Sequence, residues 1–292
     1  MESIQKPPWI KVSYQETDTF QAIKSDIKEK GLATVCQAAR CPNISECWNG
    51  GTATFLLMGD TCTRGCRFCY VKTSGKPLPL DKEEPEKLLE SIKRMKLSYV
   101  VLTSVDRDDL QDQGATHLAN CITFLKDNLP ELKIEILIPD FRGNKDLIKK
   151  IVDAKPDVIA HNIETVERLT PKVRDIRANY KQSLAVLSTV KQFSNIYTKS
   201  SIMVGLGETE NEVIKAMDDL KAQGVSFITI GQYLQPSKKH LPVASYIPLE
   251  TFKYYEQVAY DRGFLYAASG PLVRSSYKAG ELYISAVIDK KR

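Results

Sequence analysis

Six of the seven cysteines lie within residues 36–69, in two groups of three. The later group, Cys62, Cys66 and Cys69, has the spacing CxxxCxxC, and Gly65 lets the backbone turn closely around a bound group. A closed 4Fe-4S site takes four cysteine thiolates. Three cysteines in one tight loop therefore predict a 4Fe-4S cluster with one iron left open for a substrate or cofactor.

The earlier group, Cys36, Cys41 and Cys47, has the spacing CxxxxCxxxxxC and cannot share the ligands of the first cluster. It predicts a second cluster whose fourth iron takes a ligand from elsewhere. The alternative for this group is a set of buried or disulfide-bonded cysteines. For the later group the alternative is half of a zinc site, but zinc usually shows two CxxC pairs and only Cys66–Cys69 is present.

Short apolar runs alternate with amphipathic segments along most of the chain, which predicts a parallel sheet covered by helices. The predicted strands are residues 55–58, 99–102, 134–138, 158–160, 201–204 and 227–230. The predicted helices are residues 85–95, 115–129, 145–154, 180–193, 210–223 and 251–262.

Six strand-helix units predict an α/β fold, a partial (β/α)6 TIM-like barrel whose functional groups follow the carboxyl ends of the strands. Polar or reactive residues do follow the predicted strands: Cys62, Thr103-Ser104, Pro139-Asp140, His161-Asn162, the 205–208 loop and Gln232-Tyr233. We predict an N-terminal extension (1–53) with the auxiliary cluster cysteines, a barrel (54–262) and a C-terminal extension (263–292). The two extensions are expected to cover the open face of the barrel.

Composition limits the function classes. The chain has 292 residues, 42% of them hydrophobic, enough for a large core, and no segment is apolar and long enough to span a bilayer. A net charge of +5 without a clustered basic patch argues against nucleic acid and suits an acidic protein partner. We therefore expect a cytoplasmic protein without a membrane or nucleic-acid partner.

An aromatic residue, Phe68, precedes the third cysteine of the CxxxCxxC loop. This motif on a β/α barrel resembles the radical S-adenosylmethionine superfamily. The resemblance implies that the open iron chelates S-adenosylmethionine, and that one electron from the cluster cleaves it to a 5'-deoxyadenosyl radical that abstracts hydrogen from carbon.

Ordered phrases along nearly the whole chain resemble the lipoyl synthase family. Besides the two triads they are Lys6 to Trp9, Thr103 to Leu110, Pro139 to Phe141, His161 to Thr165, Met203 to Thr209 and Arg274 to Tyr277. In that family a serine of the last phrase, here Ser276, completes the coordination of the auxiliary cluster. A serine oxygen is a harder and more exchangeable ligand than a thiolate, which suits a cluster that is taken apart.

The resemblance implies an activity and partners as well. Two sulfur atoms of the auxiliary cluster are inserted at carbons 6 and 8 of an octanoyl group held on a lysine. The carrier is a lipoyl domain of a 2-oxoacid dehydrogenase or the glycine-cleavage carrier protein. An electron donor such as ferredoxin or flavodoxin and an iron-sulfur carrier that rebuilds the cluster are further expected partners.

Polar residues at the strand ends are expected to bind S-adenosylmethionine. We assign Thr103 and Ser104 to the methionyl end, Asn162 and Glu164 to the ribose, Arg174 to the carboxylate and Gly205 to the adenosine. Each has a simpler alternative as a turn-capping residue or a surface ion pair.

Two other functions are considered. One keeps the radical chemistry with another substrate, as in biotin synthase or the methylthiotransferases, and the other is a zinc-stabilised binding module. Outside the motifs, Cys121 lies on a predicted helix and is expected to be a core residue, with Leu118, Ile122 and Leu125 at helical spacing. His117 and His240 show no partner pattern.

Overall fold

The computed structural model describes residues 5–277. Its main sheet has the strand order β1-β2-β5-β6-β7-β8-β9-β10. These strands are β1 (Ala33–Thr34), β2 (Thr54–Leu57), β5 (Tyr99–Ser104), β6 (Lys133–Leu137), β7 (Val158–Ala160), β8 (Tyr197–Val204), β9 (Phe227–Gln232) and β10 (Tyr266–Gly270). A separate small sheet pairs β3 (Thr61–Cys62) with β4 (Lys72–Thr73).

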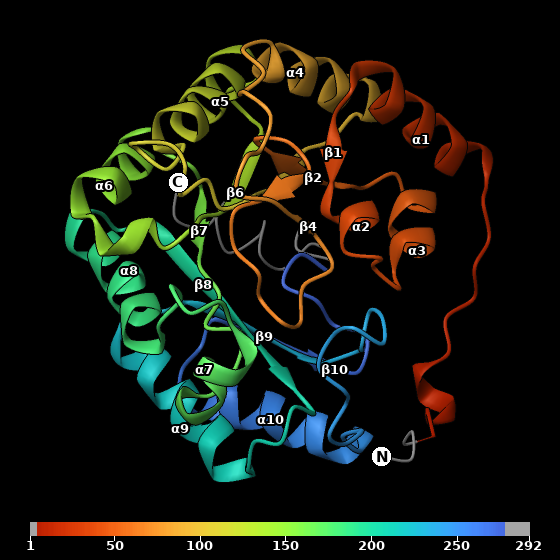
Figure 1. The fold of residues 1–292 in the computed structure, drawn as a ribbon, viewed down its shortest axis with the longest axis vertical. Coiled ribbons are helices and arrows are strands. Elements are labelled where there is room, and N and C mark those ends of the chain that lie inside the picture. Colours follow the sequence, from red (N-terminus) through yellow and green to blue (C-terminus); the bar gives the residue numbers. More distant parts are fainter. Residues whose placement is uncertain (1–4, 278–292) are drawn as a thin grey trace.

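Helices form an outer ring around this sheet (Figure 1). The ring includes α1 (Asp18–Lys30), α4 (Glu84–Met95), α5 (Ala115–Asn128), α6 (Lys145–Asp153), α8 (Tyr180–Phe193), α9 (Glu210–Ala222) and α10 (Leu249–Asp261). The short helices are α2 (Val35–Ala38), α3 (Ile44–Asn49) and α7 (Thr170–Val173), and α2 and α3 lie inward of α1. Three 3-10 turns complete the set: η1 (Pro8–Ile10), η2 (Phe141–Gly143) and η3 (Glu167–Leu169).

The predicted partial barrel is confirmed. From β2 to β10 neighbouring strands are parallel, β1 runs antiparallel to β2, and within residues 5–277 no pairing joins β1 to β10. The sheet has one parallel strand more than the six predicted, because β10 pairs with β9 from Tyr266 to Gly270. Its sequence, Tyr-Ala-Ala-Ser-Gly, is rich in small residues that rarely form strands, so the apolar pattern gave no signal.

Alternation along the strands separates two apolar layers. On β5, Val100 and Leu102 face the helices, whereas Tyr99 and Val101 face the inside of the barrel with Phe227. Helix α4 completes the outer layer with Leu88 and Ile92, which are four residues apart and fully buried. Burying a side chain of this size stabilises the fold by roughly 1.5–3 kcal/mol.

A buried ion pair lies inside the barrel. Lys199 of β8 donates to both carboxylate oxygens of Glu135 on β6, at 2.8 and 3.1 Å, and the Tyr99 hydroxyl donates to Glu135 at 2.7 Å. The three side chains connect three strands across the inside of the barrel.

The segment around α3 contacts the C-terminal segment of the described chain. The Asn43 side-chain amide donates to the Leu272 carbonyl oxygen at 2.7 Å, and the Tyr277 hydroxyl donates to Glu46 at 2.9 Å. The C-terminal segment also lies close to β9. Gly231 of β9 leaves room for it, because a Cβ there would lie 2.1 Å from the Val273 oxygen. The boundaries 1–53, 54–262 and 263–292 stay predictions, and residues 278–292 lie outside the described part. No helix in the described residues has the length and apolarity to cross a membrane.

Candidate active site

The CxxxCxxC loop follows β2 and is fastened by backbone hydrogen bonds on several sides. Cys62 ends β3, and its carbonyl accepts from the Ser74 N–H at 3.0 Å. The Thr63 N–H donates to the Asp106 oxygen after β5, and the Arg67 N–H donates to the Val173 oxygen at the end of α7, both at 2.9 Å. The loop is thereby held against the carboxyl ends of the barrel strands, as predicted.

Backbone amides point at two sulfurs of this loop. The Asp106 N–H lies 3.3 Å and the Arg64 N–H 3.4 Å from Cys62 Sγ, and the Asp175 N–H lies 3.3 Å from Cys66 Sγ. Burial raises the pKa of Cys62 and of Cys66 to about 12, which favours the neutral thiols, and a metal ligand must lose this proton. Amide donors to sulfur tune and stabilise a bound iron-sulfur cluster. The three-cysteine loop therefore fits the cluster that its spacing predicts.

Arg64, inside the loop, forms bidentate ion pairs with two aspartates, and the sequence did not predict them. Its guanidinium donates to both oxygens of Asp108 at 2.9 and 3.0 Å, and to both oxygens of Asp140 at 2.7 and 2.8 Å. Burial alone would raise the pKa of Asp108, but the hydrogen bonds from Arg64 outweigh it and lower the pKa to about 2. In the sequence, these two aspartates stand out only as members of the family-like segments Thr103 to Leu110 and Pro139 to Phe141.

The loop is also held on its outer side. Gly65 N–H donates to Asp175 at 2.8 Å, and Arg177 donates to the Thr63 carbonyl at 2.7 Å. The hydrogen bond from Arg177 lowers the pKa of Asp175. Because Asp175 follows α7, the loop is held between two separate parts of the barrel rim.

The auxiliary triad lies in one small apolar cluster built by α1, α2 and α3. Cys36 is buried in it with Phe20 and Trp48, and Cys41 and Cys47 pack against it. Burial raises the pKa of Cys36 to about 11 and also raises that of Cys41. No disulfide joins any of the seven cysteines, all of which are in the described part. The disulfide alternative is therefore wrong.

The C-terminal segment brings Ser276 to this triad. Ser276 and Cys41 line the same cavity, and the bonds from Asn43 to Leu272 and from Tyr277 to Glu46 fix the segment beside α3. Arg274 is close enough to Cys41 for the two to interact electrostatically. The role of Ser276 as the fourth protein ligand stays a prediction.

A single cavity of about 460 Å³ opens at the carboxyl ends of the strands. Most of the predicted site residues line it: Cys41, Cys62, Cys66, Phe68, Cys69, Thr103, Ser104, Asn162, Glu164, Arg174 and Ser276. Cys36 and Cys47 do not line it, because they lie behind Cys41 in the apolar cluster. One cavity thus reaches from the first cysteine loop to the auxiliary triad.

Three buried polar atoms of cavity-lining residues have no hydrogen-bond partner within residues 5–277. They are Ser104 Oγ, Asn162 Oδ1 and Arg174 Nε. A buried polar group without a partner costs roughly 1–3 kcal/mol, so such groups together indicate a polar ligand. A hydroxyl, an amide oxygen and a guanidinium suit the ammonium, ribose and carboxylate groups of S-adenosylmethionine.

Arg174 is positioned by a buried chain of hydrogen bonds. Its Nη1 donates to Ser183 Oγ at 2.8 Å, and His161 Nε2 lies 2.9 Å from the same oxygen. His161 Nδ1 lies 2.9 Å from the Ile138 carbonyl oxygen and donates to it. Burial, together with Arg174, lowers the pKa of His161 to about 4, so the ring is neutral. Sequence reasoning missed Ser183, which carries no motif.

Two predicted positions differ from expectation. Gly205 does not line the cavity; it has φ +97°, and a Cβ there would lie 2.1 Å from the Gln232 side chain and 2.5 Å from the Ser245 oxygen. Its glycine is explained by packing and by the turn. His240, for which no partner was predicted, lies 3.0 Å from the Cys69 carbonyl oxygen and 2.8 Å from Ser237 Oγ.

Comparisons with known proteins decide the family. Residues 56–220 match the model of the radical SAM superfamily. Lipoyl synthase of Halobacterium salinarum is 54% identical over 99% of this chain and 94% of its own length. The chain belongs to the lipoyl synthase family.

Other lipoyl synthases agree. That of Anaeromyxobacter sp. is 54% identical over 96% of this chain and 95% of its own length, and the mitochondrial one of Drosophila melanogaster is 51% identical over 100% and 79%. As a lipoyl synthase the chain is a radical SAM enzyme of the sulfur-inserting transferase class, with two 4Fe-4S clusters and S-adenosylmethionine as cofactors. The zinc-stabilised module and the other sulfur-inserting families are therefore wrong.

Solved structures share the fold. Methylornithine synthase has a TM-score of 0.57 at 15% identity, covering 90% of this chain and 85% of its own. A maturase of the FeFe-hydrogenase has a TM-score of 0.55 at 14% identity, covering 84% and 66%. These likenesses show that the fold is shared with both proteins.

Proposed function

We propose that this enzyme inserts two sulfur atoms, at carbons 6 and 8, into an octanoyl group on a lysine of a lipoyl-carrying protein. The observation that carries the proposal is the single cavity, lined on one side by Cys62, Cys66 and Cys69 and on the other by Cys41 and Ser276. An acyl chain in this cavity reaches both cluster sites without leaving the protein.

The proposed roles of the residues follow from this arrangement. Cys62, Cys66 and Cys69 hold the first cluster, and Cys36, Cys41, Cys47 and Ser276 hold the auxiliary cluster. When bound, the first cluster with S-adenosylmethionine supplies a 5'-deoxyadenosyl radical and the auxiliary cluster supplies sulfide. Phe68 packs between the loop and the barrel wall and lines the cavity, which limits the access of water.

The residues with unsatisfied polar atoms orient S-adenosylmethionine. Arg174 binds its carboxylate and is held by Ser183, while Thr103 and Ser104 face its methionyl end. Asn162 donates to Glu164 at 3.1 Å, and the pair faces the ribose. Glu164 has φ +67°, a strained conformation in a non-glycine residue that is consistent with a functional position.

The sharpest test is mass spectrometry of an octanoyl-lysine peptide after anaerobic incubation with the enzyme, a reductant and S-adenosylmethionine. We expect a gain of two sulfur atoms. A peptide that keeps its mass while S-adenosylmethionine is cleaved would contradict the proposed substrate.

Two variants separate the two cluster sites. Cys66→Ala is expected to abolish S-adenosylmethionine cleavage, and Cys41→Ala to keep cleavage but lose sulfur insertion. Ser276→Ala should behave like Cys41→Ala, with Ser275→Ala as the neighbouring control. Normal sulfur insertion by the Cys41 variant would rule out the donor role of the auxiliary cluster.

The proposal extends to partners and location. The net charge of +5 supports acidic partners, including the lipoyl domain or glycine-cleavage carrier, ferredoxin or flavodoxin as electron donor, and an iron-sulfur carrier. A cytoplasmic location stays a prediction, because some relatives are named mitochondrial. Pull-down with an octanoylated lipoyl domain at low and high salt tests the electrostatic part.

A further inference from the structure

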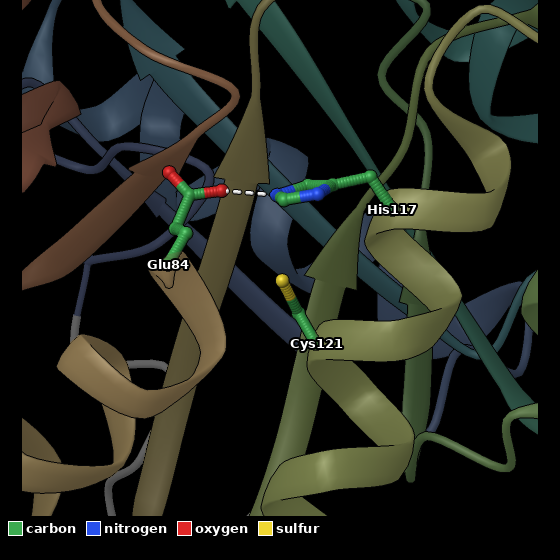
Figure 2. Close-up of side chains that lie close together, drawn as sticks. All are labelled: Glu84, His117 and Cys121. Carbon is green, nitrogen blue, oxygen red and sulfur yellow. Dashed lines mark hydrogen bonds and ion pairs between the residues drawn. The ribbon is translucent and has the colours of Figure 1, made fainter. Parts of the chain in front are cut away.

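Three side chains of metal-binding type converge between α4 and α5, outside both cysteine triads (Figure 2). Glu84 begins α4, and His117 and Cys121 lie one turn apart on α5. One ligand atom from each lies within 4.8 Å of the other two. None of the three lines the central cavity, so the group is separate from the active site.

The carboxylate of Glu84 is buried in the first turn of α4, where the helix N-terminus favours a negative charge but supplies no full cation. It accepts the Met58 N–H at 3.1 and 3.2 Å, and its Oε2 lies 2.6 Å from His117 Nε2. Among residues 5–277 no Lys or Arg forms an ion pair with it. A buried carboxylate is expensive unless a cation is near, so a positive charge is expected at this point.

Cys121 indicates which kind of cation fits. Its side chain is fully buried and faces the Glu84–His117 pair (Figure 2). Cys121 packs in the apolar core, and its sulfur also adds a soft donor atom beside the Glu84–His117 pair. A thiolate, an imidazole and a carboxylate together form a donor set typical of zinc and of similar divalent ions.

We propose that Glu84, His117 and Cys121 bind one divalent metal ion of the zinc class, with water at the fourth position. The ion replaces the proton between Glu84 and His117, which move apart to about 3.3 Å, the spacing of two ligands on tetrahedral zinc. The His117 side chain is 11% exposed, which gives the ion an entry path. The Met58 N–H orients the carboxylate from behind, as outer partners do in metal sites.

The site would be structural and connected to the first cluster loop. Met58 and Gly59, with φ of +66° and +91°, form the turn by which the chain leaves β2 toward Cys62. A metal ion on Glu84 would fix the carboxylate that holds this turn. The same bonds that position the carboxylate therefore connect the metal site to the start of the cysteine loop.

The test is a zinc titration of the cluster-loaded protein under anaerobic conditions, with iron and zinc measured in the same desalted samples. We expect one zinc per chain in addition to the cluster iron, and visible ligand-field bands when cobalt(II) is used instead. Cys121→Ser and His117→Gln should weaken the affinity at least about 100-fold with iron content unchanged. Glu86→Gln, an exposed carboxylate on the same helix, is the matched control and should bind like the wild type.

The proposal is overturned if the loaded wild-type protein keeps no zinc, or if Cys121→Ser keeps as much as the wild type. A His117→Gln variant that binds zinc as tightly as the wild type also overturns it. These readouts do not depend on sulfur insertion, so the metal site and the proposed activity can fail separately.

Discussion

At the scale of single residues, the cysteines depend on neighbours that carry no metal. Arg64 lies between two of the cysteines and is fixed by Asp108 and Asp140, which come from the ends of β5 and β6. Arg64 is 4% exposed, so its four charge-assisted hydrogen bonds form away from water. The loop therefore takes its shape from the barrel before any cluster binds.

Replacing Arg64 with Met should release the loop. The buried carboxylate of Asp140 would lose its cation, which costs about 3–5 kcal/mol in comparable sites, whereas Asp108 keeps its ion pairs with Arg142 and Arg177. We expect lower iron content at the first site and a tenfold or greater loss of S-adenosylmethionine cleavage, measured by metal analysis and by methionine release. Arg67→Met is the matched control, because Arg67 is exposed and makes one hydrogen bond of 3.3 Å to the Lys172 oxygen. Equal effects of the two substitutions would contradict a specific role of the Arg64 ion pairs in holding the loop.

His161 should make the protein sensitive to acid. Its pKa is about 4 in the folded protein and about 6.5 when unfolded, so the unfolded chain binds the extra proton between these values. Stability then falls as the pH drops from 6.5 toward 4, by about 2 kcal/mol between pH 7 and pH 5. Urea unfolding at both pH values measures this loss, which should shrink in His161→Gln. An unchanged difference would assign the acid sensitivity to other groups.

The cysteines could be predicted from spacing, whereas most of their supporting contacts could not. The CxxxCxxC spacing predicts three ligands of one cluster directly from the sequence. Ser183, which holds Arg174 and contacts His161, is an unremarkable helix residue, and its role depends on how α8 packs against β7. Glu84 and His117 are 33 residues apart, so their contact appears only when α4 and α5 pack together.

At the scale of elements, the strands that had strong apolar patterns were predicted and β10 was not. Its small side chains are needed because the chain returns across the barrel there: Gly270 lies close to Val273, and a Cβ on Gly270 would lie 3.3 Å from Val273 Cγ2. The small side chains of β10 leave room for the returning chain, but they also give no apolar pattern from which a strand could be predicted. Helix α9, by contrast, begins with a capping box formed by Thr209 and Glu212, a signal readable in the sequence.

The ion pair inside the barrel gives a prediction at this scale. Lys199→Met leaves Glu135 buried without its cation and should destabilise the protein by about 3–5 kcal/mol. The double change Glu135→Met with Lys199→Met should recover most of this loss, because apolar side chains then replace the pair. Guanidinium unfolding of the three proteins measures the coupling. A double variant no more stable than Lys199→Met would show that the pair itself is required.

At the scale of the whole molecule, segments from the two halves of the chain meet beside the proposed auxiliary site. Asn43 on one side and Leu272 on the other are 229 residues apart in sequence, yet a hydrogen bond of 2.7 Å joins them. Ser276 and Cys41 line the same cavity, and this bond is one of two that hold the C-terminal segment beside α3. The barrel itself, with the first cysteine loop, does not require it.

Asn43→Ala should therefore affect the two clusters differently. The Leu272 carbonyl loses its donor, at a cost of about 1–3 kcal/mol, and the C-terminal segment loosens. We expect less iron at the auxiliary site and less sulfur insertion, with S-adenosylmethionine cleavage near the wild-type rate. Tyr277→Phe, which removes the bonds to Glu46, should give a milder form of the same result. A parallel loss of both activities in Asn43→Ala would contradict this separation.

The contact between Asn43 and Leu272 also orders events during biosynthesis. Residues 36–47 leave the ribosome long before residues 272–277, so the auxiliary triad waits for its serine until translation is nearly finished. A nascent chain can present its first cysteine loop on a folding barrel while the sulfur-donating site is still incomplete. With Ser276 as the proposed ligand, we expect iron and sulfide to reach that site only after translation.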